Sequence, residues 1–378
     1  MASPLYLTML AGPVVAVPVP KPLTDAFVSA EITESATGPS GFQLVFSLAD
    51  DSILQTFFLL TGSSPIPVLR VILMVTFGGL PQVIMDGIVE HHEVSPGATQ
   101  GSSKLVISGH DLSALMDLVP FDGLPYPATS PNDRVEAILT KYGAFGILAQ
   151  VVEVPTPDRA VPAERVWAQK GTDLDYVQQL AKEAGYVFYM TPGPLPGTSQ
   201  AYWGPQFKFG IPQPALNVNM DSWTNVENLT FRYEPRNSVT PTVYIQSPAL
   251  GAIVAVPIPP VTPLNPPLGA IVPAPQRVTK LKDTAKRSTA EAMMLGVAEA
   301  VQNADVVTGN GTLDVDRYGQ ILRARSLVGV RGAGLAFDGM HYVDSVTHNL
   351  KLGEYKQTFV LKRNALVPNL PVVPALAY

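Results

Sequence analysis

Residues 168–189 read AQKGTDLDYVQQLAKEAGYVFY and combine a start signal, an apolar face and a stop signal for one helix. Thr172 supplies the hydroxyl of an N-cap, and Asp175 follows three residues later, as in a capping box. Apolar residues then recur at the spacing of one helix face up to Gly185, and glycine is the residue best suited to a left-handed C-cap. The apolar run after Gly185 predicts a strand. The stretch therefore predicts a helix followed directly by a strand.

Two further helices have start signals of the same kind. Ser130 precedes a proline at the first helical position and Asp133 at the third. Ser288 and Glu291 open another predicted helix, and apolar residues follow both starts at helical spacing.

The residues before these helices predict strands. Short runs rich in Val, Ile and Phe are separated by turn residues, a pattern typical of a small antiparallel barrel or sandwich. The predicted strands are 26–33, 41–48, 68–77, 83–90 and 104–108. Residues 70–77 are apolar at nearly every position, which indicates a strand covered on both faces, with a neighbouring subunit as one candidate cover. Strands resume at 186–191, 228–233 and 242–247, and from 306 to 361.

The composition excludes several classes of protein. Hydrophobic residues make up 46% of the 378 residues and charged residues 15%, and this much apolar surface excludes a disordered chain. The 37 prolines and 30 glycines exclude a mostly helical one. The longest uncharged stretch, 237–276, holds too many prolines for a membrane-spanning helix. The apolar excess therefore indicates permanent subunit interfaces, which resemble a domain core cut in half.

Residues 248–275 are an apolar, proline-rich insertion. They contain the repeat LGAIV twice, at 250–254 and 268–272, each copy flanked by prolines, which predicts an extended segment. These side chains need a cover, either a neighbouring subunit or the rest of this chain, because burial of each is worth about 1.5–3 kcal/mol. The candidate interface residues are Ile253, Val254, Val256, Ile258, Ile271 and Val272.

The net charge of −6 is unevenly distributed. Residues 1–275 carry 12 Lys and Arg against 22 Asp and Glu, a net of −10, whereas residues 276–378 carry 13 against 9, a net of +4. An acidic body repels nucleic acid. The one basic cluster, 277–287, is interpreted first as a solvated approach to a helix and second as a phosphate-binding patch.

No sequence pattern indicates catalysis or a resident metal. Zero cysteines exclude thiolate zinc sites and thiol nucleophiles. The run Glu90-His-His-Glu93 has metal-binding residue types, but neighbours on a strand point to opposite faces, so a zinc site would need a ligand from elsewhere. The run Asp314-Val-Asp316 lacks the later ligands of a calcium loop and predicts a hairpin turn. We therefore expect no enzyme, no cofactor and no metal ion.

Residues 168–189 resemble a stretch in the hub portion of VgrG and in the late control gene D proteins of contractile phage tails. The matching residues are Gln169, Thr172, Asp173, Tyr176, Leu180, Glu183 and Gly185. Residues 106–112 are similar to the passage from strand to helix after the first barrel of that family, and residues 339–359 are similar to its C-terminal strands.

The resemblance implies a β-rich α+β fold with two tail-tube-like antiparallel β-barrels and an α/β portion between them. It further implies a ring-forming homotrimer, the central hub of a contractile tail, which joins the sixfold tail tube to the threefold spike. The implied location is the tail baseplate of a virion, assembled in the bacterial host cytoplasm. The implied partners are other copies of this chain, the tail tube or its initiator protein, a spike protein as a separate chain and baseplate wedge proteins. DNA is implied only as cargo that passes through the lumen.

On this basis the chain divides into five parts. Residues 1–20 are a proline-rich arm, 21–120 the first barrel, 121–235 the α/β middle portion, 236–367 the second barrel with the insertion 248–275, and 368–378 a C-terminal tail. The family pattern has no place for the insertion.

Two other classes of protein stay open at this stage. A tail-associated enzyme that degrades cell wall or polysaccharide needs paired carboxylates in a cleft, about 5–9.5 Å apart. A carbohydrate-binding tail protein would use Trp167, Trp203 or Trp223 as sugar platforms, although tryptophans are more often core or interface anchors.

Overall fold

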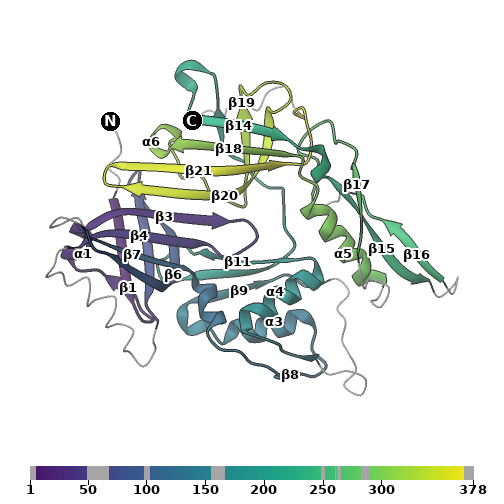
Figure 1. Cartoon of the computed structure of the whole chain (residues 1–378), viewed down its shortest axis with the longest axis horizontal. Helices are drawn as coiled ribbons and strands as arrows, with labels where there is room; N and C mark the ends of the chain where they lie inside the picture. Colours follow the sequence, from purple (N-terminus) through teal and green to yellow (C-terminus); the bar gives the residue numbers. More distant parts are fainter. Residues whose placement is uncertain are drawn as a thin grey trace.

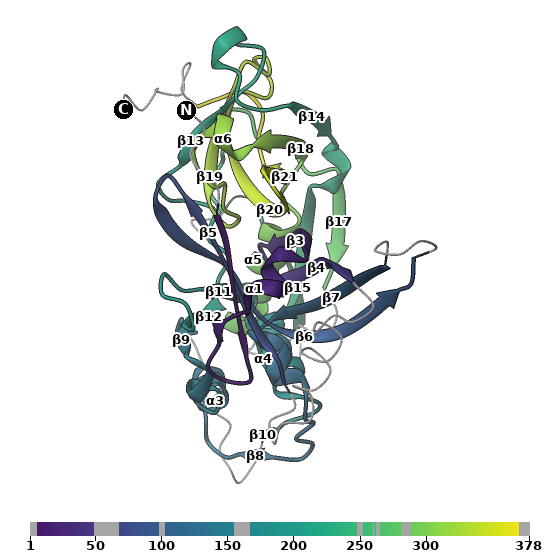
Figure 2. The ribbon, with the colours of Figure 1, turned by 90° about the vertical axis from the view of Figure 1, so that its left-hand side faces the viewer.

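The computed structural model describes residues 6–48, 68–97, 103–154, 167–247, 252–259, 261, 265–281 and 289–369 (Figures 1 and 2). The α-helices are α1 (Lys21–Asp25), α3 (Pro131–Thr140), α4 (Asp173–Ala184), α5 (Thr289–Gln302) and α6 (Val315–Tyr318). The first strands are β1 (Tyr6–Gly12), β2 (Val17–Pro18), β3 (Phe27–Ser35), β4 (Gly41–Leu48), β5 (Arg70–Phe77), β6 (Leu80–Ser95), β7 (Ser103–Asp111), β8 (Pro125–Tyr126), β9 (Ile147–Val151) and β10 (Trp167–Ala168). The later strands are β11 (Val187–Pro192), β12 (Ser199–Gly204), β13 (Gln213–Asn217), β14 (Asn228–Tyr233), β15 (Val239–Ser247), β16 (Ala252–Pro257), β17 (Arg277–Lys280), β18 (Val307–Asp314), β19 (Leu327–Arg331), β20 (Gly339–Lys351) and β21 (Glu354–Arg363).

One 13-stranded sheet contains strands from both ends of the chain. Its order is β14-β18-β21-β20-β3-β4-β7-β6-β5-β1-β2, with β13 and β19 attached beside β20. Figure 1 shows the purple strand β3 next to the yellow strand β20, which is where the N-terminal and C-terminal strands meet. The chain is therefore β-rich, and its two strand-rich ends form one continuous hydrogen-bonded surface.

Strand β5 owes its uniformly apolar sequence to burial within this chain. It pairs with β1 on one side and with β6 on the other. Val71, Leu73 and Val75 on one of its faces belong to the main core, and Ile72 on the other face is 1% exposed. A neighbouring subunit is therefore not needed to cover this strand. Strand β1 lies within the predicted N-terminal arm, so part of that arm is a strand of the large sheet.

A buried ion pair links strands β5 and β6 of the large sheet to strand β12 in the middle of the chain. The guanidinium of Arg70 on β5 donates to both carboxylate oxygens of Asp86 on β6, at 2.7 and 2.6 Å. The Ser199 hydroxyl on β12 also donates to Asp86, at 3.1 Å, and Arg70 donates to the Val14 carbonyl at 3.1 Å. Both charged side chains are almost completely buried.

The middle of the chain forms a separate α/β layer with its own core. Strand β12 pairs with β11 antiparallel and with β9 parallel, and α3 and α4 pack beside this small sheet. Strands β13 and β14 precede residue 235 but pair with β19 and β18 of the large sheet. The predicted boundary at residue 235 assigns β13 and β14 to the middle portion, whereas their hydrogen bonds join them to the C-terminal strands.

Part of the insertion is a strand rather than an irregular extended segment. β16 pairs antiparallel with β15, which pairs parallel with β17, and α5 packs on one face of this three-stranded sheet. The repeat and the prolines do not predict that β16 pairs with β15, because β15 lies outside the insertion.

One local prediction differs from the structure, and two others lie outside the described residues. The predicted hairpin turn at 314–316 is wrong: the Asp314 carboxylate accepts the backbone N–H groups of Asp316 and Arg317 and so caps α6, which ends at Gly319 with φ +83°. Ser288, the predicted cap of α5, and most of the predicted tail lie outside the described residues.

Replacement of Asp86 by alanine tests the buried ion pair. We expect Asp86→Ala to lower the free energy of unfolding by about 3–5 kcal/mol, because it leaves the Arg70 charge buried without its partner. Urea denaturation measures this loss. Arg232→Ala is the control, since Arg232 lies 3.8 Å from Glu234 and 75% of its side chain is exposed. A loss below about 1 kcal/mol for Asp86→Ala would contradict the assignment.

Candidate functional site

The predicted caps of α4 are confirmed. The Thr172 hydroxyl accepts the Asp175 backbone N–H at 3.2 Å, and the Asp175 carboxylate accepts the Thr172 N–H at 3.3 Å. The same hydroxyl donates to Asp117 at 2.8 Å. Gly185 ends the helix in the left-handed region at φ +71°. The predicted capping box at Ser130 and Asp133 is also present at the start of α3.

Gln169 and Asp173 lie at the centre of a buried polar cluster. The Gln169 side chain accepts the Tyr126 hydroxyl at 3.0 Å and donates to Asp173 at 2.8 Å. Asp173 also accepts the Lys141 ammonium at 3.1 Å and the Tyr142 hydroxyl at 2.8 Å. Burial, and then the hydrogen bond to Asp173, raise the pKa of Tyr142 above its usual range. These contacts join α4 to α3 and to the strand β8.

Tyr176 continues the cluster toward an arginine that the sequence did not single out. The Arg134 guanidinium donates to the Tyr176 hydroxyl at 2.8 Å, and its central carbon lies 4.9 Å from the Trp167 ring centre. The rings of Tyr126 and Tyr176 stack at 5.8 Å. Arg134 is 2% exposed, and nothing in its local sequence separates it from a surface arginine of a helix.

The last three residues of the resemblance serve packing. Leu180 is buried in the core of the middle layer, and Glu183 accepts a hydrogen bond from Gln179 at 2.9 Å. A side chain at Gly185 would overlap the Ala298 side chain on α5. The seven residues therefore fix the helix and its neighbours and contain no free nucleophile or paired acids.

The second stretch of the resemblance also supplies a cap. Asp111, at the end of β7, accepts the backbone N–H groups of Ser40 at 2.6 Å and of Ser113 at 3.0 Å. It thereby starts the 3-10 helix η2 (Leu112–Asp117). Burial raises the pKa of Asp111, although these donors oppose the effect.

The candidate interface residues of the insertion are not all available to a partner. Ile258 is 2% exposed and packs in a cluster with Val243 and Ala300, so this chain covers it and it does not belong to a subunit interface. Val254 is half-buried, and Val256 packs against the same cluster. The side chains of Ile253, Ile271 and Val272 are 62%, 55% and 37% exposed, and their interface role stays a prediction.

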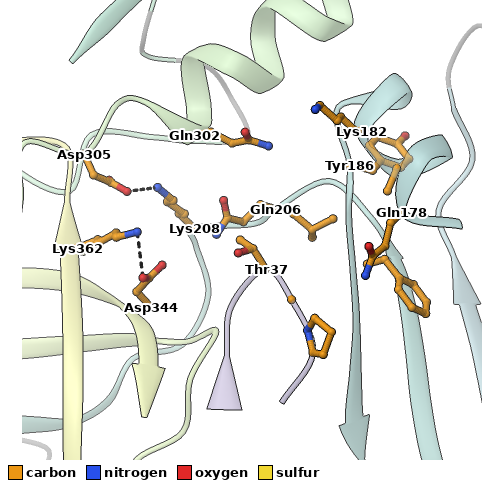
Figure 3. A pocket seen from close by; sticks show the side chains of 15 residues that line it. Thr37, Gln178, Lys182, Tyr186, Gln206, Lys208, Gln302, Asp305, Asp344 and Lys362 are labelled. Carbon is orange, nitrogen blue, oxygen red and sulfur yellow. Dashed lines mark hydrogen bonds and ion pairs between the residues drawn. The ribbon is translucent and has the colours of Figure 1, made fainter. Parts of the chain in front are cut away.

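A cavity of about 550 Å³ lies where the large sheet, α4 and the end of α5 meet (Figure 3). Lys208 forms an ion pair with Asp305 at 2.6 Å, and Lys362 forms one with Asp344 at 2.9 Å. Each of these two carboxylates in the cavity is thus paired with its own lysine. The two ion pairs therefore line the junction of the large sheet with α4 and α5.

A second buried network crosses the boundary between β3 and β20. Glu34 on β3 lies 2.7 Å from the Arg323 guanidinium and 3.3 Å from Nε2 of His348 on β20. Nδ1 of His348 lies 2.6 Å from the Tyr355 hydroxyl. Burial alone would raise the pKa of Glu34, but Arg323 and His348 outweigh it and hold the pKa below its usual range. Sequence reasoning missed Glu34 and Arg323, because they meet only in the folded sheet.

The described part of the chain contains no group of three or more side chains that could hold a metal ion. Glu90 instead contacts Nδ1 of His110 at 2.5 Å, across the β6–β7 pair. Within the same residues, no helix is long and apolar enough to cross a membrane.

The three tryptophans lie in different environments. Trp203 is fully buried and its Nε1 donates to the Val177 carbonyl at 3.3 Å, so it cannot be a sugar platform. Trp167 is half-buried beneath Arg134. Trp223 is 74% exposed.

The fold is that of phage tail proteins. A tail protein from Neisseria meningitidis has a TM-score of 0.63 at 13% identity, covering 96% of this chain and 98% of its own. The 43 kDa tail protein of prophage MuSo2 from Shewanella oneidensis has a TM-score of 0.64 at 14% identity, covering 96% of this chain and all of its own. A chain of the Francisella PdpA–VgrG complex has a TM-score of 0.58 at 12% identity, and the match covers 61% of that chain. No family model and no curated protein matches the sequence.

Gly185→Ala tests the contact between α4 and α5. The left-handed conformation alone costs a non-glycine residue about 1–2 kcal/mol, and the overlap with Ala298 adds to this loss. Gly353→Ala is the matched control, because Gly353 has φ +77° and open space around it. We expect Gly185→Ala to reduce the free energy of unfolding clearly more than Gly353→Ala, with partial recovery in Gly185→Ala/Ala298→Gly. Equal losses in both single variants would contradict the close contact.

His341 makes the stability depend on pH. It is fully buried beside Phe231, and burial, together with the Arg363 charge, lowers its pKa to about 3. Between pH 6.5 and about 3 the unfolded chain therefore binds a proton that the folded chain does not, so stability falls as the pH falls.

Between pH 7 and 5 this group alone accounts for a loss of about 2 kcal/mol. We expect His341→Gln to lose about that much less stability over this interval than the parent chain, in urea denaturation at both pH values. The same loss in both proteins would contradict a neutral, buried His341.

Proposed function

We propose that this chain is the structural hub of a contractile tail. In this role it is a trimeric adaptor that joins the sixfold tail tube to the threefold spike. The observation that carries the proposal is the likeness to two tail proteins over nearly the whole length of all three chains. The residue-level resemblance at 168–189 adds the hub to this likeness.

The two-barrel architecture belongs to the same proposal. The first barrel comprises residues 21–120 and the second residues 236–367, with β13 and β14 joining the second through β19 and β18. Residues 121–235 supply the α/β portion between them. In the assembled ring the two barrels of each copy alternate, so that three copies present six similar units to the tube.

A phage tail is favoured over a type VI or related injection system. The two tail proteins have TM-scores of 0.63 and 0.64 with this chain, whereas the chain of the PdpA–VgrG complex has 0.58. On this proposal the spike is a separate chain, baseplate wedge proteins surround the ring, and DNA passes through an acidic lumen without binding.

The described side chains support assembly rather than catalysis. Asp305 and Asp344, which line the cavity in Figure 3, each form an ion pair with a lysine. The seven residues of the resemblance have structural contacts. Large apolar side chains are exposed on several loops and on the three-stranded sheet, as expected for a subunit that buries more surface in its assembly.

The solution mass of the purified chain tests the ring. We expect light scattering to give about 121 kDa, three times 40.4 kDa, over a range of concentrations. Antibody labelling of an affinity-tagged copy in intact particles tests the location separately, and we expect label only at the spike end of the tail. Label along the whole tube or on the head would overturn the hub assignment.

A further inference from the structure

Residues 117–124 form an exposed loop, here named the apolar loop, directly after η2. Four of its side chains are large and apolar: Leu118 is 59% exposed, Val119 53%, Phe121 37% and Leu124 39%. Adjacent exposed apolar residues on one loop are unusual for a free surface and are typical of an interaction site.

The residues around Gln169 hold this loop in one conformation. The Phe121 N–H donates to the Gly171 carbonyl at 3.0 Å, and the Gly123 N–H donates to the Gln169 carbonyl at 2.9 Å. The Gln169 N–H donates back to the Leu124 carbonyl at 2.9 Å, and the Gly171 N–H donates to Asp122 at 2.8 Å. An apolar surface ordered before binding loses less conformational entropy when a partner covers it.

The surroundings of the apolar loop are acidic. Asp117 and Asp122 are exposed and accept hydrogen bonds from neutral donors, the Thr172 hydroxyl and the Gly171 N–H. The exposed charged side chains of residues 117–124 and 167–175, together with Lys141, are three aspartates against two lysines, a net charge of −1. A partner surface should therefore combine apolar side chains with cations.

The open face of the β15–β16–β17 sheet has that combination. Helix α5 packs on one face of this sheet, and Figure 1 shows the sheet on the outer side of α5. The other face of the sheet is the open face. Val278 on β17 is 68% exposed and Ile253 on β16 is 62% exposed. Lys280 is exposed and shares the open face with Val278, two residues before it, whereas Arg277 points to the α5 side. The described residues of the three strands carry no acid, so the open face has a net charge of +1.

We propose that the apolar loop of one copy docks on the β15–β16–β17 sheet of the next copy. The inference rests on the proposed function, because it assigns the contact between neighbouring subunits of the ring. The two surfaces are different regions of the same chain, so the contact is head-to-tail, and head-to-tail contacts that close generate rings. It also gives the insertion a role, since β16 supplies Ile253 to the contact.

Charge substitutions in the loop test the contact by mass. We expect Leu118→Lys/Val119→Lys to reduce the light-scattering mass about threefold, from trimer to monomer, because it places two ammonium groups against an apolar surface that already carries Lys280. Leu352→Lys is the matched control, since Leu352 is 78% exposed on the β20–β21 turn and should leave the trimer intact. Circular dichroism checks that each variant is folded.

Engineered cysteines test which surfaces meet, and the chain has no cysteine of its own to interfere. A disulfide requires Cα atoms within about 7 Å of each other. We expect Val119→Cys/Val278→Cys to give covalent dimers and trimers on oxidation, and Val278→Cys/Leu352→Cys to remain monomeric on a denaturing gel.

The outcomes separate this contact from the proposed function. A trimeric parent chain that stays trimeric with Leu118→Lys/Val119→Lys, together with a Val119→Cys/Val278→Cys variant that gives no cross-link, overturns the docking contact and leaves the ring in place. A parent chain that is monomeric at every concentration, together with no cross-link in the same cysteine variant, overturns the docking contact as well. The hub assignment then depends on the labelling of intact particles.

Discussion

Strands β3 and β20 pair in antiparallel register from Ser29–Lys351 to Ser35–Ser345, and the large sheet depends on this pairing. Without it the N-terminal and C-terminal strands would be two separate sheets, with an additional unpaired strand edge on β3 and on β20. Glu34 sits on this boundary and contacts both Arg323 and His348. A misaligned register would leave a carboxylate buried without its cation, so the network selects one register as well as stabilising it.

The middle layer uses buried polar groups in the same way. Gln169, Asp173 and Tyr176 have partners on separate elements, and each partner is satisfied only when α3, α4 and β8 lie in one arrangement. Hydrogen bonds of this kind add little net stability when formed but cost much when broken. The cluster therefore fixes the shape of the layer more than its overall stability, which suits a part whose surface must match its neighbours.

Local features of this structure could be predicted from the sequence, and long-range features could not. The caps at Ser130, Thr172 and Gly185 follow from residues within one helical turn, so the local sequence contains all the information that they need. Glu34 and Arg323 are 289 positions apart, and the paired residues of β3 and β20 are more than 300 positions apart. Strand β16 was missed because its pairing partner β15 precedes the insertion, and burial of Ile258 depends on α5.

The union of the two ends in one sheet also sets an order of events during synthesis. The Thr33 and Thr347 hydroxyls lie 3.0 Å apart but are separated by 314 positions. At a translation rate of about 5–20 residues per second, β3 waits roughly 15–60 s for β20 to be made. During this interval β3 can pair with β4, and its other edge stays open. Folding of the large sheet is complete only when the last strands have left the ribosome, so an unfinished chain keeps the β3 edge unpaired.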